Sequence, residues 1–322
     1  MEQLITNFNE AGSLLINNVG SKNASVGALY HLGSGSVSVP PGFAITFAGF
    51  RHFKQHNGLD AKLESLFSAL DTQEFSNVPQ ISLQARKIII NSKFPKALED
   101  AILSSYESTI ARQDVAVRSS VADSTLLANT GLPESFLNIS GNIALLYAIK
   151  CCYACLFNEN ALLQAGITGY DPCQIEISVG IQQMVRSDLA CSGIAIIRNG
   201  AVNISGSWGL GQNFTANLIT PDEFCISGPF STSALPVITK KHGSKSRMLV
   251  YNDLAAGTNS TINKATPGEL REQLVLTDSE IISLGRAMTE IRDKYKNDVL
   301  AEWAKDGLDG NLYVLQVQPY TL

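Results

Sequence analysis

The sequence predicts a mixed fold of helices and strands, of the α+β or α/β class, in a chain long enough for two lobes. Segments with a helical spacing of apolar residues and segments with strand-like alternation interleave in both halves. The length of 322 residues exceeds that at which a single hydrophobic core usually divides. Hydrophobic residues make up 45% of the chain and charged residues 16%, which indicates a globular protein rather than a disordered one.

The first hundred residues are expected to contain short strands and several helices. A glycine-led turn runs into a helix over residues 20–32, and a Pro-Pro-Gly turn stands between β-forming residues at 37–46. Two or three helices are predicted between residues 60 and 112 from the helical spacing of apolar residues such as Ala97, Ile102 and Tyr106.

The middle of the chain changes from helix to sheet. A buried strand, Val115 to Val117, ends on Arg118, and residues 142–164 form the longest early helix. Alternating residues then predict three consecutive strands of one antiparallel sheet, at 175–185, 193–197 and 201–207. We therefore place the lobe boundary near Pro172, with an N-terminal lobe of residues 1–172 and a C-terminal lobe of residues 173–322.

The last third begins with a glycine-rich loop at residues 206–211. Thr277, with a glutamate three residues later, forms a capping box and begins a long helix that ends near Lys296. Residues 312–317 form a last buried strand, which Pro319 ends.

Charge and hydropathy exclude several classes of partner. The net charge of −5 and the lack of a basic run give no reason to expect nucleic acid or an anionic membrane surface. No apolar stretch approaches the roughly 20 residues that span a bilayer. Residues 1–10 carry acids where a signal peptide has a basic start, so we expect a cytoplasmic protein.

Three of the six cysteines, Cys151, Cys152 and Cys155, stand close together. They lie in an apolar helical run, and no second Cys/His pair follows at metal-binding spacing. We interpret them as reduced, buried residues of the core.

Lys22 and Arg118 are the first candidates for binding an anion. Lys22 stands among small residues at the start of a helix, where a phosphate can approach the backbone, although an ordinary solvated lysine has the same pattern. The spacing of a P-loop is absent. Arg118 ends a buried strand, a rigid support for a phosphate-binding guanidinium, and Gly131 and Ser135 downstream offer an amide and a hydroxyl. A structural arginine paired with a buried carboxylate is the alternative.

Glu302 and Gln316 are candidates for binding a metal. Both carry oxygen donors, and Gln316 lies between apolar neighbours in a strand, where a buried amide must be paired. Mg²⁺ prefers oxygen ligands and commonly links one or two protein groups to substrate phosphates. A hydrogen-bonded glutamine of the core is the alternative.

Eight stretches along the chain, taken together, resemble one known family. They are VGSKNASVGAL, VSVPPGFAIT, VAVRSS, ESFLNISG, ISVGIQQMVRSDLACSGIAII, GSWGLGQN, TPDEF and EWAKDGLDGNLYVLQVQP, and they run in that order from Val19 to Pro319. The resemblance is to the N-terminal ATP-grasp nucleotide-binding domain of phosphoenolpyruvate synthase, related to those of pyruvate phosphate dikinase and rifampin phosphotransferase. It implies a two-lobed ATP-grasp fold with ATP and Mg²⁺ bound in the cleft between the lobes.

The resemblance also implies roles for individual residues. Lys22 and Arg118 fall where the family holds the ATP phosphates, and Gly131 and Ser135 fall in its phosphate-binding Gly-x-x-x-Thr region. The resemblance further implies that Gln183, Met184 and Val185 line the adenine pocket. It also implies that Glu302 and Gln316 bind magnesium.

The chain departs from the family at Gln318 and Gln212. The family has arginine in place of Gln318, at a position that contacts the transferring phosphate, and glutamate in place of Gln212. The loop at residues 121–130 also looks shorter than usual, and Leu132-Pro133 replaces a polar pair. Losing a transition-state cation costs several powers of ten in rate, so these changes affect the expected transfer reaction more than ATP binding.

Complete family members add a phosphohistidine carrier domain and an acceptor domain. The four histidines here, His31, His52, His56 and His242, do not stand in the expected Thr-His setting. Three functions therefore stay open. They are a phosphotransferase unit that charges a histidine on a separate domain or protein, a self-contained kinase or ligase that activates a small-molecule acceptor, and a non-catalytic nucleotide-binding protein.

Overall fold

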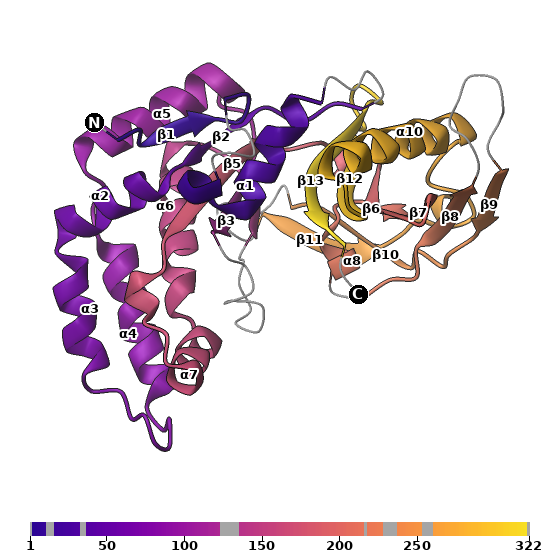
Figure 1. Cartoon of the computed structure of the whole chain (residues 1–322). Helices are drawn as coiled ribbons and strands as arrows, with labels where there is room; N and C mark the ends of the chain where they lie inside the picture. The colour runs from indigo at the N-terminus through magenta and orange to yellow at the C-terminus, as the bar shows by residue number, and fades with distance from the viewer. Residues whose placement is uncertain are drawn as a thin grey trace. The chain divides into compact units, whose positions relative to one another are not determined.

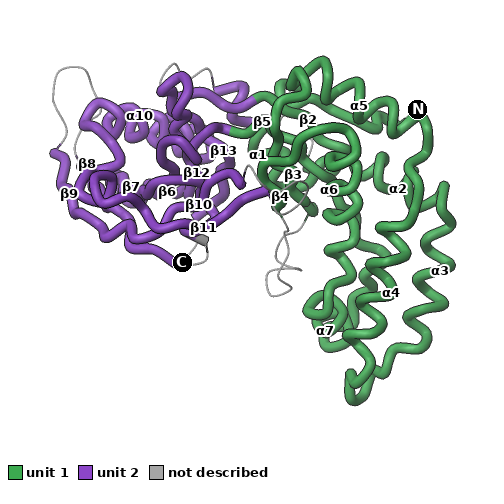
Figure 2. Tube along the Cα trace, turned by 180° about the vertical axis from the view of Figure 1, so that it is seen from behind, with its two compact units in different colours: residues 1–27, 41–184 green, residues 28–40, 185–322 purple. Residues whose placement is uncertain are grey.

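A computed structural model of the chain describes residues 2–10, 16–32, 37–122, 135–215, 218–227, 237–252 and 260–320. The chain forms two compact units, shown in different colours in Figure 2. Unit 1 consists of Met1–Gly27 and Pro41–Met184, and unit 2 of Ala28–Pro40 and Val185–Leu322. Pro172 lies within unit 1, at the start of the short helix η4 (Pro172–Gln174). The predicted boundary near Pro172 divides the sequence at one point into two lobes, whereas each of these units combines two segments of the chain. That boundary stays a prediction.

Unit 1 contains a five-stranded sheet in which every neighbouring pair of strands is antiparallel. In spatial order its strands are β1 (Ile5–Asn7), β2 (Gly42–Ile45), β5 (Ile177–Gln183), β3 (Val115–Val121) and β4 (Ser135–Ile139). The prediction that residues 175–185 share a sheet with the next two strands was wrong. Residues 177–183 instead form the central strand of this first sheet, which pairs with strands more than fifty residues away in the sequence.

Helices cover both faces of this sheet (Figure 1). The helices of unit 1 are α1 (Ile16–Tyr30, which continues into unit 2), α2 (Phe47–Asn57), α3 (Leu59–Phe67), α4 (Val78–Asn91), α5 (Lys96–Ile110), α6 (Asn142–Ala154), η3 (Cys155–Phe157) and α7 (Glu159–Thr168). Val115, Val117 and Ile181 face α2, α5 and α6 and belong to the main hydrophobic core. The first turns of α1 cover the opposite face.

Two details of the predicted helices were wrong. The helix expected over residues 142–164 is interrupted at η3, and the side chain of Asn158 begins α7 by accepting a hydrogen bond from the amide of Ala161 at 2.7 Å. An asparagine cap starts a new helix because it satisfies amides that have no partner within the helix. Ala97 is exposed, and Leu98 takes the buried place on α5 instead.

Cys151, Cys152 and Cys155 are buried free cysteines on α6 and η3, and the Cys155 thiol donates to the Cys152 carbonyl oxygen at 2.8 Å. Within the described ranges no three His, Cys, Asp or Glu side chains gather closely enough to hold a metal ion. The described helices also include none with the length and apolar character needed to cross a membrane.

Unit 2 contains a six-stranded antiparallel sheet and a two-stranded hairpin. The sheet runs in the order β13 (Leu312–Pro319), β12 (Val299–Lys305), β6 (Cys191–Arg198), β7 (Ala201–Trp208), β8 (Asp222–Ser227) and β9 (Val237–Lys241). The hairpin consists of β10 (Arg247–Tyr251) and β11 (Thr261–Ala265). The helices are η5 (Ser187–Leu189), α8 (Gln212–Thr215), α9 (Gly268–Arg271) and α10 (Asp278–Tyr295).

Helix α10 covers one face of the six-stranded sheet and confirms the predicted capping box. The Thr277 amide donates to Glu280 Oε2 at 2.8 Å, and the Glu280 amide donates to Thr277 Oγ1 at 3.4 Å. Burial acts to raise the pKa of Glu280, but hydrogen bonds from Lys305 and Thr277 outweigh it and lower the pKa. A lowered pKa means that Glu280 adds stability at neutral pH, and that this contribution is lost as pH falls through the pKa of the folded state.

Replacing Thr277 with alanine is expected to reduce the free energy of unfolding by about 1 kcal/mol, because it removes the cap from one end of α10. Urea denaturation at neutral pH measures the change. Thr277→Ser keeps the hydroxyl and should stay close to the wild type. An alanine variant as stable as the serine variant would show that the cap contributes nothing.

Candidate functional site

Arg118 lies on the face of the unit 1 sheet that is opposite the helical core. Side chains alternate along β3, so Val115 and Val117 enter the core while Arg118 takes the other face. Its cross-strand partners are Gly180 on β5 and Ser135 on β4. Gly180 has no side chain, and the Asn23 side chain of α1 occupies the space above it. The structure thus brings Arg118 and Ser135 together, as partners on adjacent strands.

Helix α1 has a kink at Gly20, and the helical turn that follows the kink lies on the same face. Gly20 has a φ of 75°, and a Cβ atom there would lie 2.4 Å from Ser120 Oγ and 2.8 Å from the Val121 carbonyl oxygen. Only glycine permits this backbone angle and this close approach. The Ser21 hydroxyl then donates to the Val121 carbonyl oxygen at 3.3 Å. The glycine-led turn predicted from the sequence is therefore confirmed.

Asn23 fixes the next residues of α1 to the central strand. Its Nδ2 donates to Ser178 Oγ at 2.9 Å, and Ser178 donates in turn to the Ile45 carbonyl oxygen at 2.6 Å. A Cβ atom on Gly180 would lie 2.2 Å from Asn23 Oδ1, so glycine is needed here as well. Lys22, half-buried between Ser21 and Asn23, thus lies on the helical turn that covers the sheet face of Arg118.

Gln183, Met184 and Val185 form the end of β5 and the connection to unit 2. The amide of Gln183 donates to the Pro41 carbonyl oxygen, and that of Met184 to the Asp114 carbonyl oxygen, both at 2.9 Å. The Gln183 side chain donates to the side chain of Gln113. Val185 begins the second segment of unit 2 and is buried.

In unit 2, Glu302 on β12 and Gln316 on β13 are direct cross-strand partners. Both lie on the sheet face away from α10, because Trp303 and Val317, their neighbours in sequence, belong to the core beneath that helix. Gln316 is 8% exposed, and no residue in the described ranges hydrogen-bonds its side-chain amide. The amide is not fully enclosed by protein atoms, so its oxygen is accessible to a ligand on this face of the sheet.

This donor set fits magnesium. A carboxylate and an amide oxygen side by side are hard ligands, and Mg²⁺ usually takes one or two protein groups and completes its shell with water and phosphate oxygens. The two candidates lie fourteen residues apart in the sequence, and the register of one strand pair brings them together.

Gln318 lies two residues beyond Gln316, on the same face of β13, opposite Leu300. Its side chain is exposed. An arginine at this position would extend from the same strand and the same face as the proposed metal ligand.

The glycine-rich loop follows β7 and is held at its backbone. Gly209 has a φ of 89°, its amide donates to the Ala190 carbonyl oxygen at 3.0 Å, and its carbonyl oxygen accepts from Ser192 Oγ at 2.6 Å. The Leu210 amide donates to the Leu249 carbonyl oxygen on β10 at 2.8 Å. Gln212 then begins α8.

Comparison with known families identifies this architecture. The model of the pyruvate phosphate dikinase AMP/ATP-binding domain matches residues 16–322. The chain belongs to this family. The mixed α+β architecture with antiparallel sheets and this membership confirm the predicted ATP-grasp fold, and they place the chain among the ATP-binding domains of phosphotransferases.

Curated relatives of the pyruvate phosphate dikinase AMP/ATP-binding family match nearly the whole chain. Phosphoenolpyruvate synthase of Synechocystis sp. is 34% identical over 99% of this chain, and that of Escherichia coli is 33% identical over 99%. Phosphoenolpyruvate synthase of Neisseria meningitidis is 32% identical over 95%. The matched regions make up 41–42% of these three relatives, so the chain spans about two fifths of their length.

One group of residues directly after Val185 was not predicted from the sequence. Arg186 makes two hydrogen bonds to the buried carboxylate of Asp188, at 2.8 and 3.0 Å, and its guanidinium lies 4.5 Å from the ring centroid of Tyr251. Its amide donates to Asp306 Oδ2 at 3.0 Å. The Arg-x-Asp spacing directly after Val185 was the available signal. These contacts hold the backbone that follows Val185.

Gly131 falls outside the described residues, as do Leu132, Pro133 and most of the loop at residues 121–130. The roles expected for them stay predictions.

Proposed function

We propose that the chain binds Mg·ATP and acts as a phosphotransferase unit of the phosphoenolpyruvate synthase type, which passes phosphate to a histidine on a carrier domain or to a small-molecule acceptor. The observation that carries the proposal is the cross-strand pairing of Glu302 with Gln316, which puts a carboxylate and an amide oxygen side by side on one face of the sheet. The names of the relatives support the type of reaction.

Lys22, Arg118 and Ser135 of unit 1 would bind the phosphates. A lysine supplies a point charge, an arginine a planar fork of donors, and a serine a hydroxyl, and all three suit phosphate oxygens. Lys22 lies on the turn of α1 that covers the sheet face of Arg118, which supports this role. The register that pairs Arg118 with Ser135 supports it as well. Gly131 is proposed to add a backbone amide.

Gln183, Met184 and Val185 would bind the adenine. The amides of Gln183 and Met184 already donate to backbone oxygens within unit 1. The Val185 carbonyl oxygen accepts from the Ser187 amide at 2.7 Å in a tight turn. This backbone is therefore held in one conformation before a nucleotide arrives, which lowers the entropy lost on binding.

Glu302 and Gln316 would hold Mg²⁺. When bound, the ion neutralises charge on the phosphates. The protein's part is to hold the two oxygen donors in register on adjacent strands, and Gln318 occupies the next position along the same face.

Gln318 favours a second candidate, a self-contained ATP-grasp kinase or ligase that activates a small molecule. A neutral amide at this position cannot supply the charge that arginine brings to a transferring phosphate. An acceptor or partner that brings its own cation would make such a residue unnecessary.

Product analysis distinguishes these functions. The protein is incubated with Mg·ATP, first alone and then with candidate small acceptors or a phosphohistidine-carrier domain, and released AMP and ADP are measured. Release that needs the carrier domain supports the first function, and release that needs only a small acceptor supports the second. Nucleotide binding without any product indicates a non-catalytic protein. No melting shift with Mg·ATP would contradict both active functions, since about 2.7 kcal/mol of stabilisation is expected at about 100 times Kd.

Replacing Gln316 with methionine tests the metal site. The variant keeps the length of the side chain but removes its oxygen donor. ATP affinity in the presence of Mg²⁺ should fall by about tenfold, the order expected for a lost charge-assisted contact. Affinity without metal should match that of the wild type, and this serves as the internal control. Equal losses with and without Mg²⁺ would assign Gln316 to the core instead.

A further inference from the structure

Unit 1 contains a pocket of about 220 Å³ at the N-terminal end of α2. Its lining includes Glu2, Thr6, Thr46 and Arg51, together with Phe47 and Ala48 of the first helical turn. At about 30 Å³ for each water molecule, it has room for roughly seven, or for one small metabolite. None of these residues belongs to the proposed nucleotide site.

The start of α2 presents two backbone donors here. Thr46 caps the helix: its Oγ1 accepts from the Gly49 amide at 3.2 Å and donates to the Gln3 carbonyl oxygen at 2.7 Å. The amides of Phe47 and Ala48 have no acceptor in the part of the chain that the structure describes. Such free amides, with the positive end of the helix dipole, favour an anion.

Thr6 is a second, independent sign of a ligand. It is only 4% exposed, it lines the pocket from β1, and its hydroxyl has no hydrogen-bond partner in the described ranges. The hydroxyl is not fully enclosed by protein atoms, so it is open to the pocket that Thr6 lines. A ligand with an acceptor oxygen would satisfy it.

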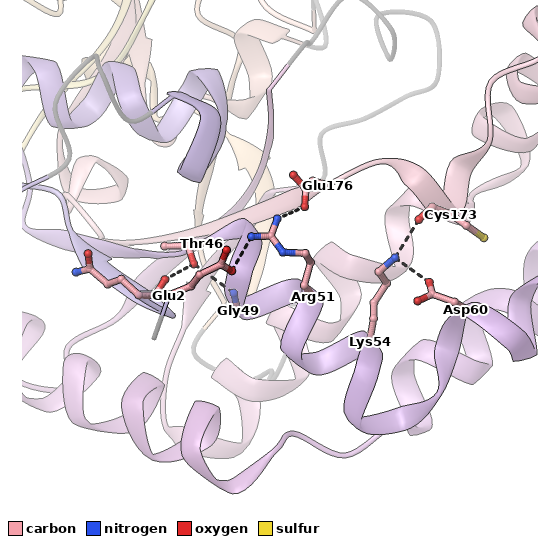
Figure 3. A network of polar contacts seen from close by, with 9 residues as sticks. Glu2, Thr46, Gly49, Arg51, Lys54, Asp60, Cys173 and Glu176 are labelled. Atoms are coloured by element: carbon pink, nitrogen blue, oxygen red, sulfur yellow. Dashed lines mark hydrogen bonds and ion pairs between the residues drawn. The ribbon is translucent and has the colours of Figure 1, made fainter.

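Arg51 supplies the charge. Figure 3 shows its guanidinium between two carboxylates. One carboxylate belongs to Glu176. The other belongs to Glu2, whose Oε2 lies 2.9 Å from Nη2 of Arg51. The Glu2 side chain is 72% exposed, so water screens this second ion pair and makes it weak. Glu2 is thus an internal carboxylate that an external anion can displace.

We propose that this pocket binds a small molecule through an oxyanion, either a carboxylate or a phosphate. The oxyanion accepts hydrogen bonds from the amides of Phe47 and Ala48 and from the Thr6 hydroxyl, and it replaces Glu2 on Arg51. These four groups are all donors, and one carries a positive charge, so a cation has no favourable place among them.

Amide chemical shifts of the ¹⁵N-labelled full chain test the proposal, with inorganic phosphate and acetate as probes in separate titrations. Saturable shifts at Phe47 and Ala48 are expected with at least one probe, and the probe that binds more tightly identifies the oxyanion. Shifts confined to residues of the proposed nucleotide site would overturn the inference. The two sites have separate reporter amides, so failure of one is distinguishable from failure of the other.

Two variants are expected to change the affinity for the anionic probe in opposite directions. Thr6→Val keeps the shape of the side chain and removes its hydroxyl, so affinity should fall about tenfold. Glu2→Gln removes the competing carboxylate at an exposed position, so affinity should rise several-fold. If the Thr6→Val variant does not fold, the affinity of the Glu2→Gln variant alone tests the proposed site. An affinity that Glu2→Gln leaves unchanged or lowers would contradict displacement of Glu2, and with it the proposed site.

Discussion

Replacing Arg118 with alanine is expected to weaken Mg·ATP binding about ten- to one-hundredfold, because a charge-assisted contact to phosphate contributes about 1.5–3 kcal/mol. Arg118 is a half-buried residue opposite Gly180 in the sheet, on the face that α1 covers. Lys22→Ala should show a smaller loss, since a lysine contributes a point charge without the planar fork of donors. Isothermal titration with ATP measures both losses.

The melting temperature without nucleotide separates this role from a structural one. Arg112→Ala is the matched control in the same unit: Arg112 is 58% exposed and pairs with Glu107 at the surface, so neither ATP affinity nor stability should change. If Arg118→Ala lowers the apo melting temperature strongly while the folded fraction still binds ATP normally, Arg118 is a structural residue of the sheet.

Local signals in the sequence predicted several elements correctly. The capping box at Thr277 and Glu280 set the start of α10, because both partners lie within one turn of the helix. The glycine-led turn at Gly20 was also predicted, although the helix begins four residues earlier, at Ile16, and has a kink at Gly20.

Pairing between distant segments was not predictable in the same way. Residues 177–183 alternate like the strands that follow them, and nothing within the segment shows that its partners are β2 and β3. For the same reason the sequence proposed Glu302 and Gln316 as ligands without showing that they face each other. That fact depends on a register with a bulge between Glu302 and Trp303.

The helix break at η3 went unpredicted for a different reason. Residues 142–157 are apolar on most sides, so no helical stripe shows where one helix ends. Asn158 was the available local signal, because its side chain caps α7.

Gln318→Arg is expected to raise the basal rate of ATP cleavage by at least about tenfold, because arginine fingers contribute far larger factors in related phosphoryl transfers. Gln318 lies on the same face of β13 as Gln316, and its exposed side chain leaves room for the longer residue. Since Lys22, Arg118, Glu302 and Gln316 are unchanged, Mg·ATP affinity should change little. Single-turnover assays with the isolated chain separate the chemical step from binding.

Two further variants at this position identify what the arginine supplies. Gln318→Lys adds the charge without the fork of donors and should recover part of the rate, whereas Gln318→Met adds neither and should match the wild type. With the correct acceptor or carrier domain present, the advantage of Gln318→Arg should shrink if that partner brings its own cation. If Gln318→Arg binds nucleotide normally and leaves the basal rate unchanged, the missing arginine does not limit the reaction. The self-contained kinase or ligase, with an acceptor that the family does not use, then becomes the better account.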